Sequence, residues 1–224
     1  MSAEHLISKS VFIENTIHVS GFPWCRTAEH RVGINSLQQR ILCRKHNSEL
    51  SPADEAGKLA CRAFEAGHAA EPLDGLPLER WLLKTAINLS LHSDLHLGIG
   101  MTDSKPGWPS PYLTAVAFGE LPFSAMMGAY FLFPAGRFMH RVGEMFFAPL
   151  HRDGCIGGFL FGLFGKYVFL NVFPGNTPPC ISDLVPGLLP EPLGSAKLAY
   201  RPQSILISAG DDNFRRIEIQ WPRP

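Results

Sequence analysis

Apolar residues that recur every three or four positions predict a helix over residues 51–65. Ser51 followed by Pro52 is typical of a helix start, with serine as the N-cap and proline in the first turn. Asp54, three residues after the serine, is expected to complete a capping box. The helix therefore buries one modest apolar face.

The same periodicity predicts a second helix from about residue 77 to residue 90, beginning at Pro77. The charged residues Glu79, Arg80 and Lys84 are expected on its solvent-exposed face. A phosphate-binding role for these charges is the less favoured alternative.

The second half of the chain changes to short apolar runs separated by Gly, Pro and Asp, which is typical of β-strands. In the last two runs isoleucines alternate by two around a turn at 210–213, which predicts a hairpin with one buried face. The proline-rich stretch 174–192 is expected to form a surface loop. The predicted strands are 112–118, 128–133, 144–148, 156–164, 167–173, 204–208 and 214–221.

The first 50 residues show little periodicity, with short strands expected at 11–13 and 17–19 and a turn at 21–24. The predicted fold class is α+β: an N-terminal zinc-knuckle or ββα-like segment, two helices, and a mainly antiparallel C-terminal sheet. We place one unit, with the two helices, at residues 1–95 and a β-rich domain at 96–224.

Composition narrows the possible functions. Of the 224 residues 46% are apolar, which is enough for a sizeable core, and Lys+Arg and Asp+Glu are both 20. A formal net charge of zero argues against binding nucleic acid or an anionic membrane by bulk attraction. Phosphate contacts would therefore need a local basic patch.

The chain is expected to be cytoplasmic and not to enter a membrane. Its N-terminus lacks a basic head followed by an apolar stretch, and its five cysteines are widely spread, which favours reduced thiols. The most apolar stretch, 155–173, is long enough to suggest a membrane span. Its glycines and Lys166 favour two strands that turn near Gly165.

Cys43 and His46 have the spacing at which a thiolate and an imidazole can bind one zinc ion. On spacing alone, the favoured interpretation is a small buried cysteine and a hydrogen-bonded surface histidine.

With these residues the chain resembles the HNH endonuclease superfamily over residues 3–65. Glu4-His5-x-Ile7-Ser8 is similar to the family's acid–histidine element, and Cys43-Arg44-Lys45-His46-Asn47 is similar to its later knuckle. The stretch 50–54, which enters the capped helix, is similar to that of uncharacterised HNH-like bacterial proteins with a β-rich C-terminal part.

The resemblance implies a ββα fold and metal-dependent hydrolysis of DNA phosphodiesters. His5 would be the general base, Glu4 a metal ligand or orienting group, and Asn47 the metal ligand on the helix, with magnesium or manganese as the ion. Cys43 and His46 would hold a structural zinc ion. An imidazole suits the base because its pKa lies near neutrality.

Arg40, Arg44 and Lys45 form a local positive stripe that could contact phosphates, so DNA is the expected partner. A protein partner is not identified by the sequence.

Two alternative ligand sets remain open. Glu29-His30 with Asn35 and Cys43 gives a second HNH-like register, rated lower because the loop after His30 is short for enclosing a metal ion. Cys25 could join Cys43 and His46 as a third zinc ligand, with His30 as the fourth.

Two further sets of residues are weaker candidates. His92, Asp94 and His96 could bind metal, although a polar loop is favoured. The glycines at 154–158 favour a turn or close strand packing over a phosphate site.

Two rival functions remain. The chain could be a catalytically decayed relative of these nucleases. It could also be a non-catalytic binding module whose β-rich half, with aromatics such as Trp108 and Tyr112, recognises a partner, with or without a zinc knuckle.

Overall fold

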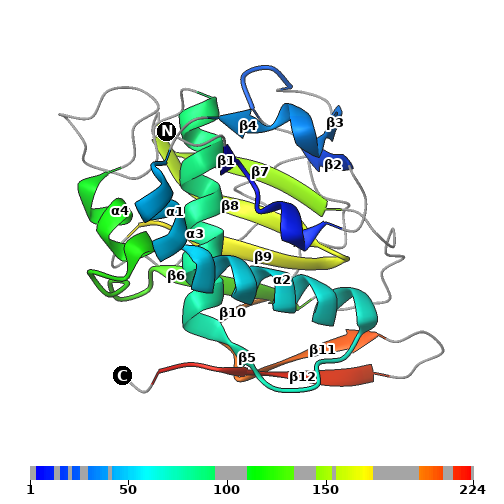
Figure 1. Ribbon diagram of the computed structural model, residues 1–224. Helices are drawn as coiled ribbons and strands as arrows, with labels where there is room; N and C mark the ends of the chain where they lie inside the picture. Colours follow the sequence, from blue (N-terminus) through cyan, green and yellow to red (C-terminus); the bar gives the residue numbers. More distant parts are fainter. Residues whose placement is uncertain are drawn as a thin grey trace.

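A long buried helix, α3 (Gly75–His92), crosses one face of a seven-stranded sheet (Figure 1). The structure is a computed structural model and describes residues 4–12, 16–19, 22–25, 30–39, 42–93, 110–133, 145–152, 155–173, 197–208 and 214–222. Helix α2 (Ser51–Ala66) packs against α3, and α4 (Pro111–Phe118) contacts α3 as well. A short helix, α1 (Arg44–Glu49), precedes α2.

The large sheet combines strands from both halves of the chain. Its order is β10-β6-β9-β8-β7-β2-β3, and all neighbours are antiparallel except β2 and β7, which are parallel. The strands are β2 (Thr16–Val19), β3 (His30–Gly33), β6 (Gly128–Phe133), β7 (Met145–Arg152), β8 (Cys155–Leu163), β9 (Lys166–Asn171) and β10 (Lys197–Tyr200).

Two smaller sheets complete the described fold. In the first, β1 (Glu4–His5) pairs antiparallel with β4 (Gln38–Gln39). In the second, the hairpin of β11 (Ser204–Ser208) and β12 (Phe214–Gln220) pairs through β12 with β5 (Leu73–Asp74). The predicted α+β class with a mainly antiparallel sheet is confirmed, and so is the C-terminal hairpin.

The apolar stretch 155–173 forms the β8–β9 hairpin, as its glycines indicated. Phe164 and Gly165 make the turn, and both have positive φ. Gly157 and Gly158 lie inside β8, where added Cβ atoms would meet the rings of Phe173 and Phe169. Across the described ranges, no helix has the length and apolar character needed to cross a membrane.

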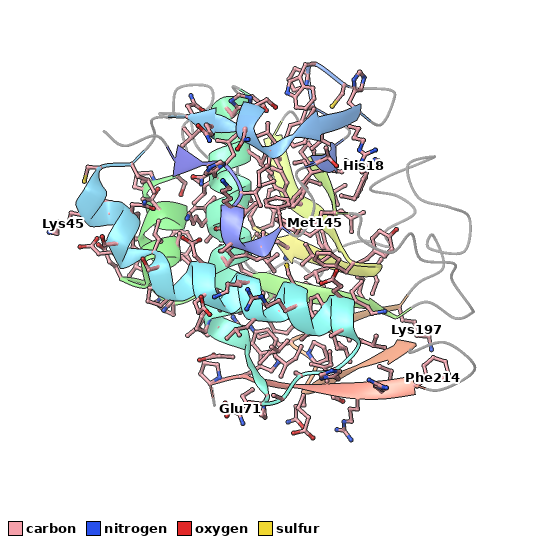
Figure 2. The ribbon with its side chains drawn as sticks, turned by 45° about the vertical axis from the view of Figure 1, so that its right-hand side comes forward. His18, Lys45, Glu71, Met145, Lys197 and Phe214 are labelled. Carbon is pink, nitrogen blue, oxygen red and sulfur yellow. The ribbon has the colours of Figure 1, made fainter. Side chains whose placement is uncertain are left out.

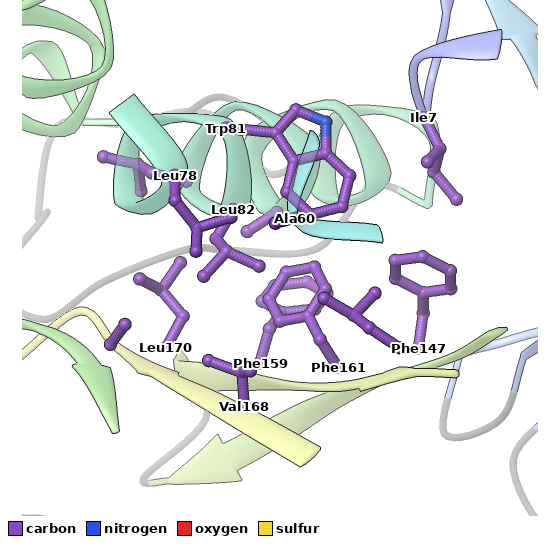
Figure 3. Packing of buried hydrophobic residues seen from close by; sticks show 14 of the residues in the cluster. Ile7, Ala60, Leu78, Trp81, Leu82, Phe147, Phe159, Phe161, Val168 and Leu170 are labelled. Carbon is purple, nitrogen blue, oxygen red and sulfur yellow. The ribbon is translucent and has the colours of Figure 1, made fainter. Parts of the chain in front are cut away.

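The core lies between α3 and the sheet. Figure 3 shows Trp81 and Leu82 of α3 facing the aromatic rings of Phe159, Phe161 and Phe147 on β7 and β8. All five side chains are fully buried. The Phe147 and Phe161 rings meet edge to face with centroids 5.5 Å apart, an arrangement that aromatic pairs favour.

The expectation that Glu79 and Lys84 lie on an outer face of the helix is wrong, because both are buried, whereas Arg80 of the same set is half-buried. Both charged side chains are tolerated inside because each has an ion-pair partner. Arg201 donates two hydrogen bonds to the Glu79 carboxylate, at 2.9 and 2.8 Å. Burial raises the pKa of Glu79, while Arg201 and the amide of Ala129 oppose that rise.

The residue that pairs with Glu79 is itself enclosed. The Arg201 guanidinium lies 5.1–5.7 Å from the ring centroids of Phe123, Tyr200 and Trp221, within the range of cation–π attraction. Arg201 has a φ of 43°, an unusual backbone conformation for a residue with a side chain. Several contacts therefore hold the link between β10 and β11.

Residues 112–118, predicted as a strand, form helix α4 instead. Ser110 caps it by accepting a hydrogen bond from the amide of Leu113 at 3.0 Å, Pro111 occupies the first turn, and Gly119 ends it with a φ of 79°. These local signals outweigh the strand propensity of the β-branched and aromatic residues.

Two further corrections concern the first 66 residues. Val11, expected in a strand, ends a 3₁₀ helix, Lys9–Val11. Ser51 begins α2 but does not cap it, because Leu50 continues the chain from α1 in a helical conformation. The Asp54 carboxylate accordingly completes no capping box, and it bonds to other side chains described below.

Several sequence predictions fall outside the described residues. They are the proline-rich loop at 174–192, Ile13, Glu29, Arg40, Asp94, His96, Trp108 and Gly154.

Gly57→Ala tests the contact between α2 and α3. A Cβ atom on Gly57 would lie 2.3 Å from Trp81 Cδ2. The helix-propensity gain of about 1 kcal/mol should be outweighed by overpacking, so the free energy of unfolding should fall by about 1–2 kcal/mol in urea denaturation. Leu59→Ala, at an exposed position of the same helix, should change it by less than about 0.5 kcal/mol. A more stable Gly57→Ala protein would contradict this packing.

Candidate metal and catalytic site

The two parts of the sequence that resemble an HNH nuclease meet in a strand–strand–helix arrangement. His5 of β1 pairs with Gln38 of β4, and the amide of Leu6 donates to the carbonyl of Leu37 at 2.9 Å. Helix α1 begins five residues after β4 ends, at Arg44. In Figure 1 β1 and β4 lie near one end of α3, and α1 lies beside the middle of the same helix.

His5 is half-buried and has one side-chain partner. Its Nε2 lies 3.0 Å from Nε2 of Gln38, whereas its Nδ1 is buried without a hydrogen-bond partner. If the Gln38 amide donates, the Nε2 lone pair of His5 is occupied and the ring proton is on Nδ1. Gln38 is exposed, so water can replace it at Nε2 when it turns away.

Cys43 and His46 are brought together at the start of α1. The Cys43 Sγ and the His46 Nδ1 are 3.5 Å apart, and both side chains are exposed. Two ligands at Zn–S and Zn–N distances of about 2.3 and 2.0 Å in tetrahedral geometry would lie about 3.5 Å apart. The pair therefore has the spacing of two ligands of one zinc ion. The same distance also fits a hydrogen bond between the thiol and the imidazole.

The orientation of His46 is restrained from the other side. Its ring meets the ring of Phe118, at the end of α4, with centroids 5.4 Å apart and an interplanar angle of 65°. This contact links the knuckle segment to α4, the helix whose residues were predicted to form a strand.

The structure shows fewer side-chain contacts for the other predicted site residues. Asn47 is half-buried in the first turn of α1, and its amide donates to the carbonyl of Cys43. Lys45 is exposed, with its ammonium 3.9 Å from Glu49 Oε1. Glu4 lies in β1 and Arg44 begins α1, but their side chains are outside the described part of the structure.

The described residues show no complete metal-binding cluster. Within them, no three His, Cys, Asp or Glu side chains gather around one point. No hydrogen bond or ion pair joins His5 to Cys43, His46 or Asn47 in the part of the chain that is placed. The described side chains thus supply a histidine base and a thiol–imidazole pair as separate units.

The alternative ligand set with Cys25 and His30 is not gathered by the fold. Cys25 lies in the turn between β2 and β3, where burial raises the pKa of its thiol and a hydrogen bond to the backbone of Phe22 partly opposes that rise. His30 is exposed on β3, with its ring edge-on to Trp24. A buried, protonated thiol is a poor zinc ligand.

Sequence reasoning missed a polar cluster beneath the site. Lys84 is buried and donates to both Asp54 carboxylate oxygens at 2.8 Å. Ser8 Oγ donates to Asp54 Oδ1 at 2.5 Å and accepts from Trp81 Nε1 at 3.3 Å. We call these four residues, Ser8, Asp54, Trp81 and Lys84, the lysine cluster.

The lysine cluster joins the two motifs from which the resemblance was drawn. Ser8 ends the acid–histidine element and Asp54 ends the stretch that leads into α2. Asn88, also on α3, donates to the carbonyl of Leu6 at 3.3 Å and so holds the residue next to His5. The available signal was that a serine ends one motif and an acid ends the other. Their buried partner, Lys84, could not be predicted from helical periodicity.

Comparisons with known proteins returned no match from any family model, curated protein or solved structure.

Asp54→Ala should be strongly destabilising because it leaves the Lys84 ammonium buried without its counter-charge. We expect a loss of about 3–5 kcal/mol in the free energy of unfolding by urea denaturation. Adding Lys84→Met should recover part of that loss, since the double variant buries no unpaired charge.

The adjacent acid provides the control. Glu55 is exposed and pairs with Lys58 on the surface of α2, so Glu55→Ala should cost less than about 1 kcal/mol. Equal losses in Asp54→Ala and Glu55→Ala would show that the buried pair does not stabilise the fold.

Proposed function

We propose that the chain is an HNH-like, metal-dependent nuclease that hydrolyses DNA phosphodiesters. The observation that carries this proposal is the antiparallel pair of β1 and β4 followed by α1, with His5 on the first strand and the Cys43–His46 pair at the helix start. This order of elements is the one that the resemblance implies. The 32 residues between the strands form an insertion that contributes two strands to the large sheet.

His5 is the general base of the proposed reaction. Its Nε2 accepts a proton from the attacking water once the Gln38 amide turns away, and the neutral imidazole is a competent base near neutral pH. Asn88 and the lysine cluster hold the segment that follows this histidine, at the carbonyl of Leu6 and the hydroxyl of Ser8. The exposed Lys45 is the described cation available for a phosphate contact on α1.

The Cys43–His46 pair fits a structural zinc ion by its 3.5 Å spacing and by its donor types. Bound there, zinc would cross-link the start of α1 and stabilise the knuckle. Among the described residues, no group of three or more His, Cys, Asp or Glu side chains could hold the catalytic ion.

A second candidate is a non-catalytic binding module. Ser8 and Asp54, which belong to the motif segments, make buried bonds to α3. These contacts stabilise the fold, and a relative that had lost catalysis but kept its fold would retain them. In this reading the knuckle is structural and the β-rich half binds a partner.

Nicking of supercoiled plasmid in magnesium or manganese distinguishes the two candidates. His5→Ala should lower the nicking rate by on the order of 10²-fold or more, because it removes the proton acceptor. Gln38→Ala should retain or raise the rate, because it frees Nε2 of His5. If His5→Ala nicks as fast as the wild type, the assignment of the base is wrong.

Elemental analysis of the freshly purified protein tests the knuckle. We expect about one zinc per chain, lost in Cys43→Ser because the site would retain too few ligands. Cys25→Ala should keep its zinc, since Cys25 is buried in a separate turn. Wild-type zinc content in Cys43→Ser would remove the knuckle from the proposal.

A further inference from the structure

The turn Phe22–Cys25, between β2 and β3, presents the ring of Trp24 to solvent. Trp24 is 41% exposed, whereas Phe22 and Cys25 are buried. The amide of Cys25 donates to the carbonyl of Phe22 at 2.9 Å, and Pro23 occupies the position of the turn at which proline is favoured. The backbone on both sides of Trp24 is therefore fixed.

The indole ring of Trp24 is also held from the inside. The ring of Phe22 lies almost parallel to it, with centroids 5.6 Å apart and an interplanar angle of 14°. Phe22 in turn meets the core ring of Phe159 on β8, at a centroid distance of 6.5 Å. The ring of His30 on β3 stands nearly perpendicular to the indole, at 77°. A ring held in this way needs little ordering before another flat ring stacks on its exposed surface.

The segment that carries Trp24 is basic, although the whole chain has a net charge of zero. Residues 16–47 hold five of the chain's 20 Lys+Arg residues and one of its 20 Asp+Glu residues. One of the five, Arg31, follows His30 on the edge strand β3, is exposed, and donates to the hydroxyl of Thr16 at 3.0 Å. Figure 2 shows His18, the residue of β2 that pairs with Arg31, in the upper right of the view. This uneven distribution supplies the local positive charge that a nucleic-acid ligand requires of a neutral protein.

We propose that Trp24 is a stacking site for an unpaired base of a DNA strand, so that the preferred substrate is single-stranded DNA or a duplex with an unpaired segment. This inference rests on the proposed nuclease function and adds the form of DNA on which the chain acts. An exposed indole accepts any base, because every base has a π-face, and basic side chains nearby attract the phosphates. A base inside a duplex is already stacked on its neighbours and must leave the helix to reach such a ring.

A base fits the Trp24 ring better than a protein segment or a second copy of the chain. The exposed residues of β3, of the 3₁₀ helix that follows it and of β4 are polar or glycine: His30, Arg31, Gly33, Asn35, Ser36, Gln38 and Gln39. Protein interfaces depend on clusters of buried anchors, whereas these groups suit phosphate and sugar oxygens. Two copies would bring the same basic segment against itself, which is unfavourable.

The stacking site lies within reach of the proposed base, His5. Eight positions separate His30, which contacts Trp24, from Gln38, which contacts His5. Eight residues span at most about 29 Å when fully extended, which is less than one turn of B-form DNA at about 34 Å. Figure 1 shows β3 and β4 along the top of the view. A strand whose base stacks on Trp24 can therefore extend to the Nε2 atom of His5.

Fluorescence polarisation with the full chain tests the stacking site. The probes are fluorescein-labelled dT₁₂ and an abasic oligomer with the same number of phosphates and no bases. No magnesium or manganese is added, so that binding is measured apart from metal-dependent cleavage. The wild type should bind dT₁₂ about fivefold or more tightly than the abasic oligomer, and added salt should weaken both.

Substitution of the ring gives the sharper arm. Trp24→Ala should lose about fivefold or more in affinity for dT₁₂ and keep its affinity for the abasic oligomer, a difference that unfolding would not produce. Trp24→Phe, which retains a ring, should restore part of the preference for dT₁₂. Leu59→Ala, at an exposed position on α2, is the matched control and should change neither affinity.

Four binding results would overturn the proposal. They are equal wild-type affinity for the two oligomers, unchanged binding of dT₁₂ by Trp24→Ala, tighter Trp24-dependent binding of a proline-rich peptide such as GPPLPPG than of dT₁₂, or sedimentation of the wild type as a dimer that Trp24→Ala dissociates. The first two mean that no base stacks on Trp24. The last two identify a protein segment and a second copy as the occupants.

Cleavage assays separate this inference from the proposed nuclease function. In magnesium or manganese the wild type should cut single-stranded circular DNA faster than relaxed duplex circles, and Trp24→Ala should remove that preference. Cleavage that depends on His5 but shows no preference for single strands would overturn the stacking inference alone. Trp24-dependent binding of dT₁₂ without metal-dependent cleavage would support the stacking site and overturn the nuclease function.

Discussion

Burial of charge on α3 is the constraint on which the rest of the structure depends. A helix surrounded by the core can hold Glu79 and Lys84 only if each meets an opposite charge before water is lost. The partners come from distant parts of the chain: Arg201 lies beyond β10, and Asp54 lies on α2. The two ion pairs therefore fix the position of α3 relative to the C-terminal hairpin and to the preceding helix.

The same helix determines how firmly the candidate site is held. Asn88 and Lys84 reach the segment that follows β1, through Leu6 and through Asp54 with Ser8. A two-residue strand such as β1 cannot hold a side chain in place by its own ladder, because it makes too few hydrogen bonds. The placement of His5 thus depends on α3 as much as on its pairing with Gln38.

The elements with strong local signals could be predicted from the sequence. Strands at 128–133 and 204–208 were predicted at their observed bounds, and α2 to within one residue. Helix α4 was predicted as a strand, because its β-branched and aromatic residues have strand propensity. Ser110-Pro111, which matches Ser51-Pro52 in sequence, is the local signal for its helix start.

The site was only partly foreseeable. The proximity of Cys43 to His46 followed from their spacing near a helix start, since residues three apart share a helix face. The lysine cluster did not, because its bonds join residues 30 to 73 positions apart and helical periodicity reports only how a residue faces its neighbours. Strands β1, β4 and β5 are two residues long, which is too short for an alternating pattern.

The parallel pairing of β2 with β7 has a consequence for biosynthesis. His18 of β2 is in register with Phe146, roughly 130 residues later, so β2 cannot join the large sheet until most of the chain has left the ribosome. At translation rates of about 5–20 residues per second this delay is about 6–26 s. During that time the apolar side chains of Ile17 and Val19, which end fully buried, have no sheet to enter. Until then, the neighbour that β2 can pair with is β3, and its parallel ladder to β7 is the later of its two pairings.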